Sequence, residues 1–67
     1  METLRSTYYF ETKAQAKRFR SEMRQCFILT EYASDYAVRI FDFERIKEDK
    51  KKEVSSLAQK VYREIMK

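Results

Sequence analysis

The chain has 67 residues, a formal net charge of +4, one cysteine, and no histidine, glycine or proline. This length corresponds to one small domain spanning residues 1–67. A single cysteine excludes an intrachain disulfide, the lack of histidine excludes Ser-His and Cys-His catalytic pairs, and the lack of glycine excludes a phosphate-cradling loop. One cysteine without histidine also argues against a zinc site. We therefore expect a protein without a cofactor, a metal or an enzymatic activity.

Residues 3–11 alternate between two faces, which is typical of a strand. Leu4, Tyr8 and Phe10 fall on one face, whereas Tyr9 falls on the other. Threonine and tyrosine are enriched here, as they are in strands generally. The pattern predicts a strand that is half-buried on its Leu4, Tyr8 and Phe10 side.

A helix is predicted directly after this strand. Thr12 and Gln15 have the spacing of a capping box, in which each side chain bonds the other residue's backbone amide. We expect the helix to run to about Gln25. Residues spaced three, four and three apart form its apolar stripe: Ala16, Phe19, Met23 and Cys26. The position of Cys26 on this stripe predicts a buried, unreactive thiol.

The densest apolar run, residues 26–43, predicts a β-hairpin. Strands are expected at residues 27–30 and 36–43, with a turn at Ala33-Ser34-Asp35. Because the Asn-Gly and Asp-Gly pairs of tight turns are missing, we expect a loop of about three to five residues.

The pattern becomes helical from Glu44 to Lys67, where no helix breaker occurs. We favour one long helix over this range. The alternative is a helix that begins near Asp49, with Asp49 as its N-cap. The apolar stripe has spacings of three and four and consists of Val54, Leu57, Ala58, Val61 and Ile65.

The predicted order is β-α-β-β-α, an α+β class. A right-handed crossover makes the first two strands parallel, and the third strand fits between them. Two helices then cover one face of a three-stranded sheet, as in a truncated ferredoxin-like fold with a long C-terminal helix. A three-stranded antiparallel sheet in another order is the alternative. Either arrangement leaves a sheet face and two edges without cover, which favours a homodimer or another protein partner.

Three side chains are predicted to point away from the helices: Tyr9, Arg39 and Phe41. Arg5 is expected on the same face. Exposed Tyr, Phe and Arg are typical of protein interfaces, and base stacking is the less favoured interpretation. Our leading hypothesis is a small non-enzymatic binding protein that acts as a regulator, inhibitor or adaptor.

The first helix also has a basic ridge. Its members are spaced four, three and four apart and are Lys13, Lys17, Arg20 and Arg24. Such a ridge can lie on a phosphate backbone, so a nucleic-acid-binding protein is the alternative function. A solvated face that only keeps the protein soluble would have the same composition.

Residues 1–10 lack the apolar run of a signal peptide, and no stretch approaches the length of a membrane span. With a lone cysteine, this predicts a cytoplasmic protein that does not enter a membrane. In length, charge and element order the sequence resembles small accessory proteins of bacteria, their phages and plasmids, although no motif assigns it to one family.

Overall fold

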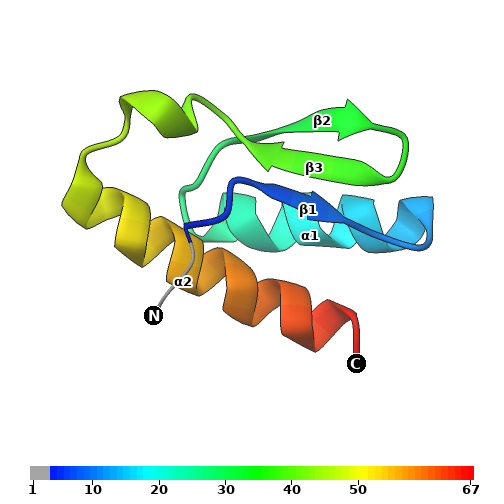
Figure 1. Ribbon diagram of the computed structural model, residues 1–67. Helices are drawn as coiled ribbons and strands as arrows, with labels where there is room; N and C mark the ends of the chain where they lie inside the picture. The colour runs from blue at the N-terminus through cyan, green and yellow to red at the C-terminus, as the bar shows by residue number, and fades with distance from the viewer. Residues whose placement is uncertain (1–3) are drawn as a thin grey trace.

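The computed structural model describes residues 4–67, which form one sheet and two α-helices (Figure 1). A single turn of 3-10 helix, η1, precedes the second α-helix. The elements in chain order are β1 (Thr7–Tyr9), α1 (Lys13–Gln25), β2 (Thr30–Ser34), β3 (Ala37–Ile40), η1 (Phe43–Arg45) and α2 (Glu48–Ile65). The α+β class, with a three-stranded sheet and two helices, is therefore confirmed.

The strands lie in the order β1-β3-β2, and β3 pairs antiparallel with both neighbours. The strand that comes last in the chain is therefore the central one, and β1 and β2 form the two edges. Tyr8 lies opposite Val38, and Val38 lies opposite Tyr32. Residues that face one another across a ladder share one face of the sheet, so this register aligns the alternating pattern of all three strands.

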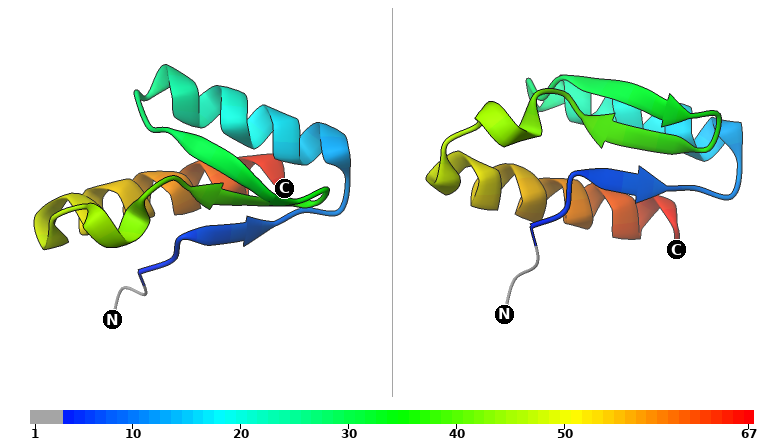
Figure 2. Two further views of the ribbon diagram at one scale, coloured as in Figure 1. Left: turned by 90° about the horizontal axis from the view of Figure 1, so that it is seen from above. Right: turned by 45° about the horizontal axis from the view of Figure 1, so that its top comes forward.

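Both helices lie on the same side of the sheet (Figure 1 and Figure 2). α1 contacts β2, β3 and α2. The rings of Tyr8 and Phe10, on and just after β1, lie 5.4 and 5.2 Å from the ring of Tyr62 in α2. Within residues 4–67 the other side of the sheet carries no helix (Figure 2), as the sequence pattern predicted.

The core fills the space between the sheet and the two helices. Phe19 of α1 is fully buried and lies 5.1 Å from Tyr8 and 5.2 Å from Phe10, measured between ring centroids. Leu4, predicted to share their face, is 40% exposed. The buried residues that form the core cluster are Tyr8, Phe10, Ala16, Phe19, Met23, Val38, Ile40, Phe43, Ala58 and Ile65.

The predicted capping box begins α1. The Thr12 hydroxyl accepts a hydrogen bond of 3.2 Å from the Gln15 amide, and the Gln15 side chain accepts one of 3.1 Å from the Thr12 amide. Two amide groups that the helix itself cannot pair are thereby satisfied. The prediction of the helix start is confirmed.

The end of α1 differs from the prediction at Cys26, whose side chain is exposed rather than buried. Phe27 follows with φ 61°, in the left-handed region. The amide of Ile28 bonds the Met23 carbonyl, and the amide of Phe27 bonds the Arg24 carbonyl. This is the Schellman motif, which turns the chain out of the helix and carries the thiol away from the core.

The hairpin turn is tighter than predicted, because only Asp35 and Tyr36 separate β2 from β3. Neither has positive φ, so the turn is not one of the primed types that two-residue hairpins favour. The register of β2 on β3 shifts between Tyr32 and Ser34, which marks a β-bulge. A bulge adds local twist, and we attribute the tight turn without glycine to it.

The predicted single helix from Glu44 onward is wrong. Phe43 lies in η1 and is buried in the core, and Ile46 is extended and half-buried against it. These apolar contacts hold the chain outside a continuous helix. α2 begins at Glu48, and Lys47 rather than the alternative Asp49 is its N-cap.

Both edge elements also differ in extent from the prediction. β1 covers Thr7–Tyr9, a shorter span than the predicted residues 3–11, of which residue 3 lies outside the described residues. The first hairpin strand was predicted at residues 27–30 but begins at Thr30, because the Schellman turn occupies the preceding positions.

Candidate protein-binding surfaces

The face of the sheet without helices, here called the open face, carries all three predicted protein-binding residues. Along β3, Val38 and Ile40 are buried toward the helices, so Arg39 and Phe41 fall on the opposite side. Tyr9 is 63% exposed and Phe41 is 46% exposed. The predicted placement of Tyr9, Arg39 and Phe41 on this face is therefore confirmed.

The register fixes their spacing on the open face. Arg39 lies opposite Thr7 of β1 and Glu31 of β2, in the middle row of the sheet. Tyr9 lies opposite Ala37, two positions before Arg39, whereas Phe41 lies two positions after it. At about 3.3 Å per residue, the two aromatic side chains sit about 7 Å to either side of the central arginine along the strand direction.

An ion pair neutralises the centre of the open face. The Arg39 Nε donates a hydrogen bond of 3.0 Å to the Glu31 carboxylate, and Nη2 contacts the same oxygen. The hydrogen bond first, and the charge of Glu31 second, raise the pKa of Arg39 above its ordinary value. The open face thus offers two aromatic side chains around a charge-neutral pair.

Arg5 does not share this face, contrary to the prediction. Its guanidinium carbon lies 4.8 Å from the Tyr8 ring centroid and 5.1 Å from that of Tyr62, so the side chain folds toward the helices. Its Nε donates a hydrogen bond of 3.0 Å to the Thr7 carbonyl. The Arg5 side chain therefore contacts two aromatic rings at the β1 edge and does not lie on the open face.

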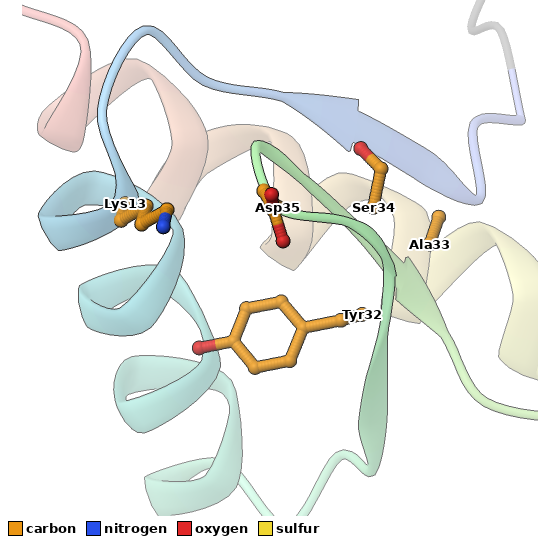
Figure 3. Close-up of a pocket in the computed structure, with 5 residues that line it drawn as sticks. All are labelled: Lys13, Tyr32, Ala33, Ser34 and Asp35. Carbon is orange, nitrogen blue, oxygen red and sulfur yellow. The ribbon is translucent and has the colours of Figure 1, made fainter.

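The predicted basic ridge follows α1 along the β2 edge. From α1, Lys17, Arg20 and Arg24 line a groove whose other wall is formed by Leu29, Thr30 and Tyr32. The fourth member, Lys13, borders an adjacent pocket with Tyr32 and the hairpin turn. Figure 3 shows the Tyr32 ring reaching from β2 toward α1, with its hydroxyl end beside the helix.

Arg20 links the two walls of this groove. Its guanidinium carbon lies 4.6 Å from the centroid of the Tyr32 ring, a cation-π distance. Its Nε and Nη2 lie 3.4 and 3.5 Å from the Thr30 hydroxyl and carbonyl oxygens. These contacts align a positive charge with the edge of β2.

Two further exposed apolar side chains were not singled out from the sequence. Phe27 is 96% exposed and Leu29 is 70% exposed. Leu29 pairs with Phe41, whose amide donates a hydrogen bond of 3.0 Å to its carbonyl. The signal in the sequence was weak, because both residues belong to the apolar run that was assigned to a strand.

Within residues 4–67, no three His, Cys, Asp or Glu side chains are grouped so that they could hold a metal ion. Neither α1 nor α2 has the length and apolar content that crossing a lipid bilayer requires. Comparison with family models, with curated proteins and with solved structures found no match to this chain. The surfaces described above are therefore the basis for assigning a function.

Proposed function

We propose that the protein is a small non-enzymatic protein-binding module, a regulator, inhibitor or adaptor, and that the open face is its contact surface. One observation carries this proposal. Tyr9 and Phe41 remain 63% and 46% exposed on a face whose opposite side is packed by both helices. Exposed aromatic residues beside an arginine have the composition of interface centres rather than of ordinary surface. Tyr9 and Phe41 are the proposed anchors, and Arg39 is the polar group between them.

We propose that the protein contacted by the open face is a second copy of the chain, so that the homodimer is the form that meets any further partner. A two-fold interface brings one patch against itself, which is unfavourable for a surface with net charge. The open face meets the requirement for little net charge, because the charges of Arg39 and Glu31 neutralise one another. A 67-residue chain also has a marginal core, so burial of further apolar surface in a dimer adds stability that the monomer lacks.

Two further proposals concern the fold type and the location of the protein. We interpret the β1-β3-β2 sheet with both helices on one side as a ferredoxin-like arrangement without its last strand. We place the protein in the cytoplasm, since the exposed thiol of Cys26 stays reduced there.

Sedimentation velocity of the wild-type protein over a range of micromolar concentrations tests the dimer. We expect a monomer–dimer equilibrium that Phe41→Ala shifts toward monomer by about tenfold or more, equivalent to about 1.4 kcal/mol. Tyr36→Ala is the matched control. Tyr36 is an aromatic residue that is 48% exposed, against 46% for Phe41, but it lies in the hairpin turn. A monomer mass at every concentration contradicts the homodimer.

A further inference from the structure

The backbone of β2 presents hydrogen-bonding groups to the groove that it forms with Lys17, Arg20 and Arg24 of α1, here called the basic groove. The Leu29 carbonyl accepts the Phe41 amide, so this residue pair is bonded within the sheet. Bonded positions alternate along an antiparallel ladder, which directs the amides and carbonyls of Thr30 and Tyr32 outward. The 3.5 Å approach of Arg20 to the Thr30 carbonyl is consistent with this outward direction.

The other edge of the sheet is closed by its own side chains. By the same alternation, Thr7 and Tyr9 direct their carbonyls outward from β1. Arg5 donates a hydrogen bond of 3.0 Å to the Thr7 carbonyl, and the Tyr62 hydroxyl donates one of 2.8 Å to the Tyr9 carbonyl. Natural sheets protect an edge against strand addition in this way. On β2 only the Thr30 carbonyl is bonded in this way, by Arg20 at the longer distance of 3.5 Å, whereas the Tyr32 amide and carbonyl are bonded to no side chain within residues 4–67. β2 is therefore the edge more open to a further strand.

The charge of the groove restricts the occupant. Lys17, Arg20 and Arg24 line it, and none of the described residues that line it is acidic. Pairing of two β2 edges would bring two of these basic ridges together, and the chain itself carries a net charge of +4. A second copy is therefore unsuited to this site, whereas an anionic partner is complementary to it.

We infer that β2 accepts an extended acidic segment of a partner protein, which adds to the sheet as a fourth strand. Its backbone pairs with Tyr32 and with Thr30, where it displaces Arg20 from the carbonyl. Its carboxylates face Lys17 and Arg24. Peptide recognition of this kind takes its affinity from main-chain hydrogen bonds and its specificity from alternate side chains. Leu29, 70% exposed, offers an apolar contact to an intervening residue.

A single-stranded nucleic acid is the other anionic ligand of comparable shape. Two observations favour the peptide. The alternating amides and carbonyls of an edge strand match a peptide backbone, and one face of the Tyr32 ring is already covered by Arg20, which limits stacking of a base there. The site shares no residue with Tyr9, Arg39 and Phe41, so failure of the open face as an interface leaves this inference standing, and the reverse also holds.

The first experiment selects binders to the full-length protein from a display library of random dodecapeptides. We expect enrichment of peptides rich in Asp and Glu. Lys17→Glu should weaken the selected peptides about tenfold, because it reverses a charge in the groove. Arg18→Glu makes the same charge change one position along α1, but Arg18 lines a different groove, against α2. This control should change the affinity less than about twofold.

The second experiment distinguishes strand addition from simple charge attraction. N-methylation of every second amide of a selected peptide should abolish binding in one register and preserve it in the other, since only alternate amides face an edge strand. Equal effects in both registers overturn the inference, as does a selection without acidic peptides. Tighter binding of twelve-nucleotide poly-U or poly-dT than of the peptides, sensitive to Lys17→Glu, also overturns it and makes the groove a phosphate-binding site.

Discussion

The hydroxyl of Tyr62 in α2 donates a hydrogen bond of 2.8 Å to the backbone carbonyl of Tyr9 in β1. The bond ties the last helix to the first strand, and its acceptor is one of the outward carbonyls of that edge. The same tyrosine packs its ring against Tyr8 and Phe10 in the core. One side chain thus contributes to both the stability of the domain and the closure of an edge.

We expect Tyr62→Phe to lower the free energy of unfolding by about 0.5 to 1 kcal/mol, because the ring contacts remain and one hydrogen bond is lost. Urea denaturation followed by circular dichroism measures this change. Tyr36→Phe removes a hydroxyl from a side chain that is 48% exposed at the hairpin turn, and it should stay within about 0.5 kcal/mol of wild type. Equal losses in both variants would show that the Tyr62 bond contributes nothing specific.

Phe27→Gly should stabilise the protein. Phe27 has φ 61°, a conformation that costs a residue with a Cβ about 1–2 kcal/mol. Glycine removes this cost at the C-terminus of a helix, although the unfolded chain gains freedom. We expect a net gain of about 1 kcal/mol in the free energy of unfolding.

Phe27→Ala is the control for the ring, because alanine keeps the Cβ. It should change the stability by less than about 0.5 kcal/mol, since the ring is 96% exposed. A loss of stability in both variants would instead mean that the ring packs against a neighbouring surface in solution, as a partner contact would require. A loss in the glycine variant alone would mean that the freedom gained by the unfolded chain outweighs the cost of the left-handed conformation.

Periodicity predicted the parts of the fold that depend on local pattern. Alternation placed Tyr8 and Val38 toward the helices and Phe41 away from them, because a strand can bury only every second residue on one face. The capping box located the start of α1 for a similar reason, since its two bonds join residues three positions apart. The basic ridge could likewise be placed on one helical face.

Tertiary contacts decided the parts that the sequence did not predict. Ile46 is extended because it packs beside Phe43 in the core, although the surrounding residues favour a helix. The left-handed conformations of Phe27 and Asp42 could not be foreseen, because such positions usually carry glycine and this chain has none. The groove required knowledge that α1 runs along the β2 edge, which only the assembled sheet provides.

The Cys26 thiol should react in the folded protein. Its position on the apolar stripe of α1 predicts burial, whereas the C-cap geometry leaves it exposed. We expect stoichiometric modification by 5,5′-dithiobis(2-nitrobenzoic acid) without denaturant, at a rate that urea changes little, since access requires no unfolding. A rate that rises steeply with urea would mean that the thiol is buried in the folded protein and reacts only after unfolding.

Stability should fall at alkaline pH because of Tyr8. Burial raises the pKa of this phenol above its ordinary value of 10.0, and a hydrogen bond with Ser55 and the charge of Arg5 oppose that shift only in part. Below about pH 10 the phenol is neutral in both the folded and the unfolded chain, so its full contribution is present. Above that pH the unfolded chain loses a proton that the folded chain retains, and the free energy of unfolding decreases until the pH passes the folded pKa.

Urea denaturation between about pH 8 and pH 11 measures this decrease, and Tyr8→Phe separates it from other alkaline effects. The variant loses both the bond with Ser55 and the hydrogen bond of 2.9 Å from the Tyr8 hydroxyl to the Arg5 carbonyl, which together cost about 1–3 kcal/mol at neutral pH. Its stability should nevertheless decline less steeply than that of the wild type above pH 10, so the two curves converge. Parallel curves would mean that the folded and unfolded chains hold the Tyr8 proton equally, and the alkaline loss would then arise from other groups.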